Sequence, residues 1–530
     1  MDRPTADTEA GPVEGIPCRD RSVTVFRGIP YAAPPVGELR WRPPQPPERW
    51  EGVRRADRFG PMCPQAPNEA AATGVDVPMS EDCLSLNIWT GVPSRDERRP
   101  VLVWIYGGGF REGTGAQPRY DGENLARQGL TVVTFNYRLG AFGFLATPEL
   151  SAESEHGSSG NYGLLDCVAA LRWVRDNIAH FGGDPDRVTI AGQSAGAGLV
   201  NFLAMSPLAK GLFHRAIAQS HARHSRDPEL RYLSTSYRLP AAAESAGSQY
   251  LRLRGARSIR ELRAQHWHKL IDGHDPIDTS VETGGTAGPP LLRPVVDGWA
   301  IPAGYDETYA KGLQNDIDYL AGNNLDECGA VPPSLVGALR TGRRTTRPGS
   351  PPVHVTLDQH QAAAHRKFGP LADEFLRLYP ATTDGEAAQA ASRAARDNSR
   401  LSTHLWGTDW SRHGTRSLHT YFWTHRSKAA NAGPRGACHG SEIDYVFGNP
   451  VGGTDAWTEE DHEIARTVSG YWTNFVATGD PNGTGLPRWP AFTPDAGSVM
   501  EIGAHFAPIT VADPERTGFW LRFFDTQQAW

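Results

Sequence analysis

One short segment constrains the fold of this chain more than any other: Gly-Gln-Ser-Ala-Gly at residues 192–196. It follows the apolar, strand-like residues 188–191 and precedes small residues that can start a helix. A serine in so tight a strand-to-helix turn has a strained backbone that lifts its hydroxyl above the sheet, and the two glycines leave room for the turn. The pattern predicts that Ser194 is a nucleophile, although an ordinary turn of small residues can give the same five letters by chance.

A second glycine segment supports this interpretation. Residues 104–110, Trp-Ile-Tyr-Gly-Gly-Gly-Phe, close a predicted strand. Three glycines at the end of a strand bring bare backbone amides close to a ligand, so Gly108, Gly109 and Ala195 are the predicted donors to a developing oxyanion. The alternative is a flexible turn, which the flanking tryptophan and phenylalanine argue against.

Strand-like and helix-like patterns alternate over much of the chain. Nearly continuous apolar runs, typical of strands covered on both faces, lie at residues 84–89, 101–106, 130–137, 188–191, 215–219 and 317–320. Residues 163–180 show the apolar spacing of a helix, and residues 358–368 and 459–478 also look helical. The alternation predicts an α/β fold with a large, mostly parallel central sheet and helices on both faces. No linker divides the chain, so we expect a single domain over residues 1–530 with a flexible N-terminus at residues 1–15.

Composition argues against several other kinds of protein. The formal charge of −7 argues against a basic surface that binds nucleic acid. No apolar run reaches the ~18 residues of a membrane span. The N-terminus carries no secretory signal, so we expect a cytoplasmic protein, or a secreted one if a leader has been removed. The cysteines and histidines show no metal-ligand spacing, and we expect no cofactor. The oligomeric state stays open.

A serine nucleophile needs a base, and the base needs an acid that orients it. In folds with such a turn, the acid follows the serine along the chain and the histidine comes last. Asp326 and Glu327 follow the predicted strand at residues 317–320, and the spacing leaves them equal candidates for the acid. Among the later histidines, His439 is the one set in a loop of small residues.

Seven different short motifs follow one another along the chain, at residues 81–87, 106–110, 136–144, 181–185, 192–196, 324–327 and 439–443. With these motifs the chain resembles the type B carboxylesterases, the family that includes cholinesterases and bacterial carboxylesterases. The resemblance implies an α/β-hydrolase fold and a serine esterase that hydrolyses small-molecule carboxylic esters through an acyl-enzyme. It implies that Glu327 is the acid and His439 the base, and that Ser220 supports these catalytic residues from a neighbouring position. A carbamate or amide hydrolase, or a non-catalytic binding protein on the same fold, is the alternative.

The resemblance also implies three structural pairs: the buried ion pairs Arg40–Glu81 and Arg138–Asp166, and a disulfide between Cys63 and Cys83. A further pair, Cys328 and Cys438, flanks the proposed acid and base. If Glu327 bonds to His439, the two backbones run close together, but adjacent side chains on an extended segment point opposite ways. A disulfide, with its narrow geometric limits, and two buried thiols are therefore both open for this pair.

Two features depart from the family pattern. The residue before the nucleophile is usually Glu in this family, whereas here it is Gln193, which removes a negative charge from the floor of the site. The segment at residues 64–82 contains no aromatic residue, although cholinesterases place a tryptophan there. A quaternary ammonium would lose a cation–π face and a nearby carboxylate, so we do not expect choline esters as substrates.

A basic loop follows the predicted strand at residues 215–219, at the carboxyl end where ligands bind in such sheets. It holds His221, Arg223, His224 and Arg226. Arginine pairs with carboxylates, so this loop could select esters that carry a carboxylate on the acyl side. The plainer alternative is a solvated loop, because runs of charge are usually surface features.

Overall fold

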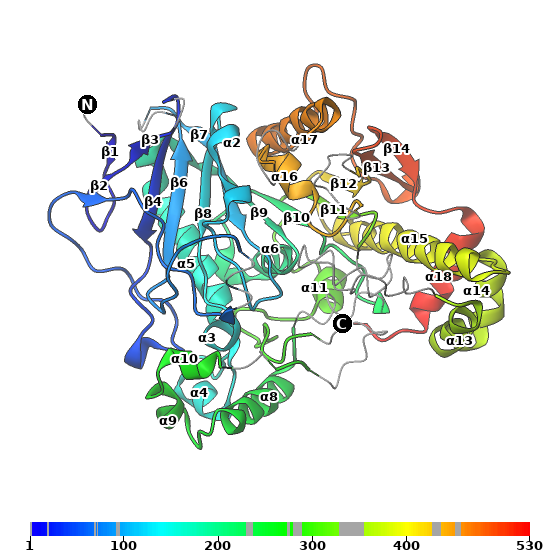
Figure 1. Cartoon of the computed structure of the whole chain (residues 1–530), viewed down its shortest axis with the longest axis horizontal. Coiled ribbons are helices and arrows are strands. Elements are labelled where there is room, and N and C mark those ends of the chain that lie inside the picture. Colours follow the sequence, from blue (N-terminus) through cyan, green and yellow to red (C-terminus); the bar gives the residue numbers. More distant parts are fainter. Residues whose placement is uncertain are drawn as a thin grey trace, which may run out of the picture.

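The computed structural model describes residues 3–18, 21–67, 70, 73–91, 96–228, 237–272, 276–278, 289–327, 355–426, 436–450 and 457–529. Its main feature is a twisted sheet of eleven strands that runs through the molecule (Figure 1). From one edge to the other, the strands are β14 (Ala507–Thr510), β13 (Ser498–Ile502), β12 (Leu418–Trp423), β11 (Asp318–Asn324), β10 (Arg215–Gln219), β9 (Gly183–Gln193), β7 (Arg99–Ile105), β8 (Thr131–Phe135), β6 (Ser85–Thr90), β4 (Thr24–Pro30) and β3 (Ile16–Pro17).

The centre of this sheet is parallel. The strands from β13 across to β8 all pair in parallel, and β14, β6, β4 and β3 add antiparallel edges. Each strand predicted from an apolar run is present, with bounds shifted by a few residues. The largest shift is in β9, which begins at Gly183 and continues to Gln193. The predicted mostly parallel sheet is confirmed.

Helices cover the sheet on both faces. They are α2 (Glu123–Arg127), α3 (Gly140–Phe144), α4 (Pro148–Glu153), α5 (Tyr162–Asn177), α6 (Ala195–Met205), α8 (Pro240–Leu253), α9 (Ile259–Arg263), α10 (Trp267–Leu270), α11 (Tyr305–Lys311), α13 (Leu357–Phe368), α14 (Ala372–Leu378), α15 (Asp384–Ser411), α16 (Glu442–Phe447), α17 (Glu459–Thr478) and α18 (Pro514–Asp525). Helices α5 and α6 pack against β9, while α2 and α17 pack against strands that include β6, β7 and β8. The helix predicted at residues 163–180 ends earlier, at Asn177, and a 3₁₀ turn follows.

Both predicted buried ion pairs are present. Arg40 donates to Glu81 from Nε at 2.6 Å and from Nη2 at 2.5 Å, and Arg138 donates to Asp166 from Nε at 2.8 Å and from Nη2 at 2.7 Å. Paired donors of this kind match the two carboxylate oxygens and fix orientation as well as charge. The Arg138–Asp166 pair is almost fully buried.

The predicted Cys63–Cys83 disulfide is not formed. Both residues are buried free thiols. Cys63 Sγ accepts a hydrogen bond from the backbone N–H of Leu139 at 3.3 Å. The hydrogen bond between the two thiols, together with burial, raises the pKa of Cys83 well above its usual value. A thiol contact therefore closes this loop instead of a covalent bond. The second candidate pair is Cys328 and Cys438, and Cys328 lies outside the described residues.

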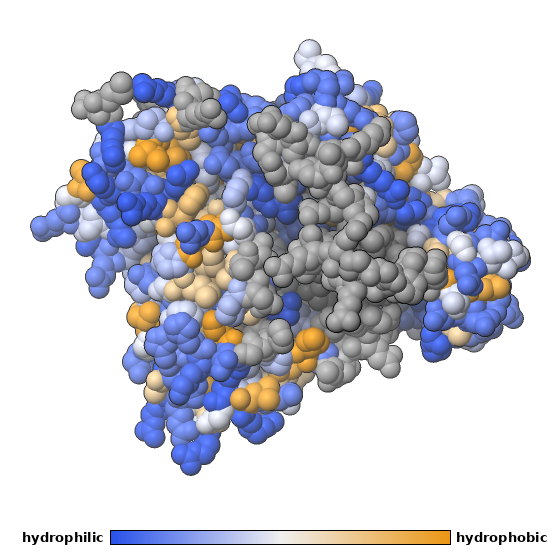
Figure 2. All heavy atoms as spheres, viewed as in Figure 1, coloured by the Kyte–Doolittle hydropathy of each residue, from blue (hydrophilic) through white to orange (hydrophobic). Residues whose placement is uncertain are grey.

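Hydrophilic residues predominate on the face shown in Figure 2, and hydrophobic residues are scattered over it. Large exposed hydrophobic side chains occur on separate segments, as at Val53, Leu253 and Leu521. Among the helices of the described ranges, none is long and apolar enough to cross a membrane.

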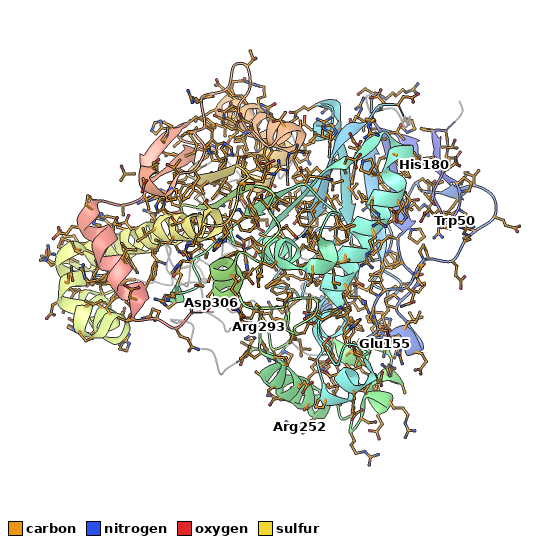
Figure 3. All side chains as sticks on the ribbon, turned by 180° about the vertical axis from the view of Figure 1, so that it is seen from behind. Trp50, Glu155, His180, Arg252, Arg293 and Asp306 are labelled. Atoms are coloured by element: carbon orange, nitrogen blue, oxygen red, sulfur yellow. The ribbon has the colours of Figure 1, made fainter. Side chains whose placement is uncertain are left out.

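The N-terminal segment differs from the expectation of a flexible tail. Strands β1 (Thr5–Ala6) and β2 (Val13–Glu14) join β5 (Arg54–Arg55) in a small separate sheet. Trp50, labelled in Figure 3, donates its indole N–H to the carbonyl of Pro12 at 3.0 Å. The described part of residues 1–15 is thus held by backbone pairing and by an aromatic anchor.

Candidate active site

Ser194 stands on a strained turn between β9 and α6. Its backbone has φ 58° and ψ −126°, a conformation that a residue with a side chain rarely adopts. A Cβ on Gly196 would lie 2.1 Å from the carbonyl oxygen of Ile105, and one on Gly192 would lie 2.6 Å from the backbone of Gly196. Both glycines are therefore required by the close approach of the neighbouring backbone, as the sequence pattern predicts.

The glycine segment after β7 lies against this turn. A Cβ on Gly107 would come within 3.0 Å of the Cβ of Ser194. Gly108 and Gly109 have φ values of 114° and 62°, which favour glycine. Within the described ranges, neither amide donates to a protein acceptor. Two unused N–H groups beside a raised hydroxyl are what an oxyanion site needs.

Glu327 meets His439 where two loops converge. Glu327 follows β11 and His439 precedes α16, and Glu327 Oε2 lies 2.6 Å from Nδ1 of His439. Glu327 Oε1 also accepts the backbone N–H of Asn324 at 3.1 Å. Burial alone would raise the pKa of Glu327, but the charge and hydrogen bond of His439, with help from Arg223 and the nearby Ser220, lower it to about 2. The carboxylate is therefore ionised at neutral pH.

Asp326, the other candidate acid, points elsewhere. Its Oδ1 accepts from Arg396 Nη2 at 2.7 Å and from Arg426 Nη2 at 3.0 Å. Its Oδ2 accepts from the backbone N–H of Ala437 at 3.0 Å. The spacing in the sequence leaves Asp326 and Glu327 equal, whereas the structure brings only Glu327 to the imidazole.

The second ring nitrogen of His439 contacts the side chain of Gln193, and the sequence does not predict this contact. Nε2 lies 3.0 Å from Nε2 of Gln193. The Ser194 hydroxyl makes no hydrogen bond to another residue in the described ranges. In this resting arrangement the amide of Gln193 therefore occupies the position on the base that the serine hydroxyl would need.

Glu442 is a buried carboxyl behind the acid that sequence reasoning does not single out. It accepts from Gln219 Nε2 at 2.9 Å and from Asn324 Nδ2 at 2.5 Å. Burial raises its pKa. It lies in the motif at residues 439–443, but only the fold brings it to Asn324 and Gln219.

The four residues of the basic loop have different surroundings. Arg226 is partly exposed and pairs with Asp525 at 3.2 Å, and His224 Nε2 lies 3.4 Å from Asp409. His221 and Arg223 are buried instead, close to the proposed site. The expectation of a solvated loop holds for Arg226 and fails for the two buried residues.

Arg223 is an incompletely paired buried cation. Its Nη1 donates to the carbonyl of Ser399 at 3.0 Å, while Nε and Nη2 have no hydrogen-bond partner among the residues that the structure describes. Burial lowers the pKa of Arg223, and the charges of Asp227 and Glu327 oppose this effect. Burial and then the charge of Arg223 lower the pKa of the neighbouring His221 to about 3. His221 therefore stays neutral, and Arg223 carries the positive charge of this region.

The whole chain matches a known family. The sequence model of the Carboxylesterase family covers residues 2–520. Fumonisin B1 esterase from Sphingopyxis macrogoltabida is 37% identical over 94% of this chain and 86% of that protein. Phenmedipham hydrolase from Pseudarthrobacter oxydans is 34% identical over 96% of each chain, and liver carboxylesterase from Sus scrofa is 33% identical over 98% of this chain and 92% of that protein.

A solved structure has the same fold. A PNB esterase superimposes with a TM-score of 0.76 at 30% identity, over 98% of this chain and 99% of that one. The α/β-hydrolase architecture is thus shared along nearly the full length of both chains. The chain therefore belongs to the carboxylesterase family and is a carboxylic ester hydrolase.

Proposed function

We propose that the chain hydrolyses carboxylic esters through an acyl-enzyme on Ser194, with His439 as base and Glu327 as the acid that orients it. The observation that carries this proposal is the 2.6 Å contact between Glu327 and His439, beside a serine held at positive φ. A buried, ionised carboxylate fixes the imidazole tautomer and stabilises the cation that forms when the base accepts a proton.

The steps follow from these positions. His439 Nε2 takes the proton of Ser194 while the serine oxygen attacks the ester carbonyl. The amides of Gly108, Gly109 and Ala195 donate to the oxyanion, which is the largest electrostatic contribution expected in such a site. His439 then protonates the leaving alcohol, and water repeats the sequence on the acyl-enzyme.

The proposed substrates are esters with a carboxylate on the acyl side. Support comes from Arg223, whose Nε and Nη2 are buried and find no hydrogen-bond partner in the described part of the chain. Buried guanidinium N–H groups without acceptors are costly, and a substrate carboxylate that reached Nε and Nη2 would satisfy both. The neutral Gln193 adds no repulsion to such a substrate. Of the four residues in the predicted basic loop, Arg223 is therefore the proposed binding group, with His221 beside it, and His224 and Arg226 have no part in substrate binding.

The catalytic part is tested by steady-state hydrolysis of 4-nitrophenyl butyrate. Ser194→Ala is expected to abolish turnover while the melting temperature stays within a few degrees of wild type. Turnover by a folded Ser194→Ala enzyme at the wild-type rate would overturn the proposal.

The substrate part is tested with two esters of matched length, 4-nitrophenyl hemisuccinate and 4-nitrophenyl butyrate. Arg223→Gln should lower the ratio of their kcat/KM values by about tenfold or more, because a charge-assisted hydrogen bond is lost. Arg226→Gln is the matched control and should leave this ratio unchanged. Equal losses on both esters in Arg223→Gln would show that Arg223 serves the acid Glu327 and does not select the substrate.

A further inference from the structure

The contact between Gln193 and His439 pairs a side-chain amide nitrogen with the ring nitrogen that faces away from Glu327. Glu327 is ionised and can only accept, so Nδ1 of His439 must carry a proton toward it. A neutral imidazole then has a lone pair on Nε2, which accepts from the Gln193 amide N–H at 3.0 Å. A doubly protonated ring would instead place an N–H against the amide N–H of Gln193.

The packing of the Gln193 side chain leaves it little freedom. A Cβ on Gly107 would lie 3.2 Å from Oε1 of Gln193, and a Cβ on Gly440 would lie 3.3 Å from its Nε2. The amide is thus held between the glycine segment after β7 and the loop that carries His439. Gln193 itself is buried and belongs to β9, the strand that also positions the nucleophile.

We propose that Gln193 is a positioning residue that holds the base neutral until substrate binds: its amide donates to Nε2 of His439 in the free enzyme and gives way to the Ser194 hydroxyl during attack. Because the amide carries no charge, it orients the ring without favouring the imidazolium. This inference rests on the proposed roles of Ser194 and His439.

Other ionisable groups also face the base and its acid, and they come from several elements. They are Glu327 after β11, His221 and Arg223 after β10, Glu442 on α16, Tyr421 on β12, Cys438 beside the base, and Arg119, which donates to the carbonyl of Gly440. Asp326 adjoins the acid, but its carboxylate points to Arg396 and Arg426. All of them are the same in wild type and in a Gln193 variant. A change of pH dependence between the two therefore reports on position 193.

The test is the pH dependence of kcat/KM for 4-nitrophenyl butyrate, which follows the ionisation of the free enzyme. Gln193→Glu places a carboxylate oxygen where the amide N–H now lies, which favours the protonated ring. We expect the acid limb of the profile to move upward by about one pH unit or more. Gln193→Met removes the donor without adding charge, and we expect a smaller shift in the same direction.

Gln128→Glu is the matched control, because it adds the same charge on an exposed residue after α2. Its profile should coincide with that of wild type. An acid limb at the wild-type pH in Gln193→Glu, or in Gln193→Met if the first variant does not fold, would overturn the inference. His439→Gln distinguishes a failure of this inference from a failure of the proposed function. If it is inactive while the Gln193 variants show no shift, the proposed function stands and only the role of Gln193 fails. If His439→Gln keeps its activity, the proposed base itself is wrong.

Discussion

Asp326 pairs with Cys438 as an isolated parallel β-bridge, so the segment that carries Glu327 lies alongside the segment that carries His439. The N–H of Asp326 donates to the carbonyl of Ala437 at 2.9 Å, and its carboxylate accepts the N–H of the same residue at 3.0 Å. Arg426 and Arg396 neutralise that carboxylate from outside. Asp326 thus joins the loop of the acid to the loop of the base without touching the imidazole.

The two adjacent carboxylates should respond differently to loss of charge. Glu327→Gln removes the partner of His439 and should lower kcat by roughly 10³-fold or more. Asp326→Asn keeps the backbone bridge and should lower kcat far less, with a lower melting temperature because two arginines lose their partner. Steady-state kinetics and thermal unfolding of both variants measure this. A larger loss of kcat in Asp326→Asn would reverse the assignment of the acid.

Glu327 should also make stability depend on pH. Its folded pKa of about 2 lies below the ordinary value of 4.5, so its charged form stabilises the fold above pH 4.5, and this contribution is lost as pH falls toward 2. At neutral pH the contribution is about 3 kcal/mol. Denaturant unfolding of wild type and Glu327→Gln should give free energies whose difference shrinks steadily as pH falls from 5 to 3. A constant difference over that range would contradict this.

The buried Arg138–Asp166 pair should be costly to break. Asp166→Asn leaves the guanidinium without its counter-charge, and we expect the free energy of unfolding to fall by about 3 kcal/mol or more. Glu261→Gln removes the partner of Arg257 in an exposed pair and is the control, with no measurable change expected. Equal stability of the two variants would mean that the buried pair contributes no more than a surface contact.

The turn at Ser194 should not tolerate a side chain at Gly196. A Cβ there would lie 2.1 Å from the carbonyl oxygen of Ile105, so Gly196→Ala must distort the turn or the strand beside it. We expect loss of esterase activity and a lower melting temperature. Gly385→Ala is the control: no atom lies within 4 Å of its Cβ position, and it begins a helix, so stability should rise by up to about 1 kcal/mol. Wild-type activity in Gly196→Ala would refute the steric argument.

The parts of the fold that follow local rules could be predicted from the sequence. The strands of the parallel centre read as apolar runs because both of their faces are covered, and α17 begins and ends at the predicted residues. The 28-residue helix α15 could not be found in this way. Its inner face consists largely of Ala, Ser, Thr and Asn, as at Ala390, Ser402 and Thr403, so apolar spacing does not reveal it.

The site likewise has residues that local patterns predict and contacts that only the folded chain shows. Ser194 and the glycine segment are local patterns, and the family resemblance gives Glu327 and His439. The contact of Gln193 with His439 joins residues 246 positions apart, and the burial of Arg223 depends on α15. The two thiols at Cys63 and Cys83 also show that a pairing implied by resemblance need not be formed in a given chain. Such relations depend on long-range packing, which a single sequence does not display.

The most direct test of the central claim is covalent labelling by diisopropyl fluorophosphate, which reacts with activated serines by displacement of fluoride. Peptide mass spectrometry should find one diisopropylphosphoryl group, on Ser194, and hydrolysis of 4-nitrophenyl butyrate should fall in proportion to its incorporation. Ser194→Ala should take up no label under the same conditions. Labelling at another serine, or full esterase activity in an enzyme whose Ser194 is completely labelled, would contradict the claim that Ser194 is the nucleophile.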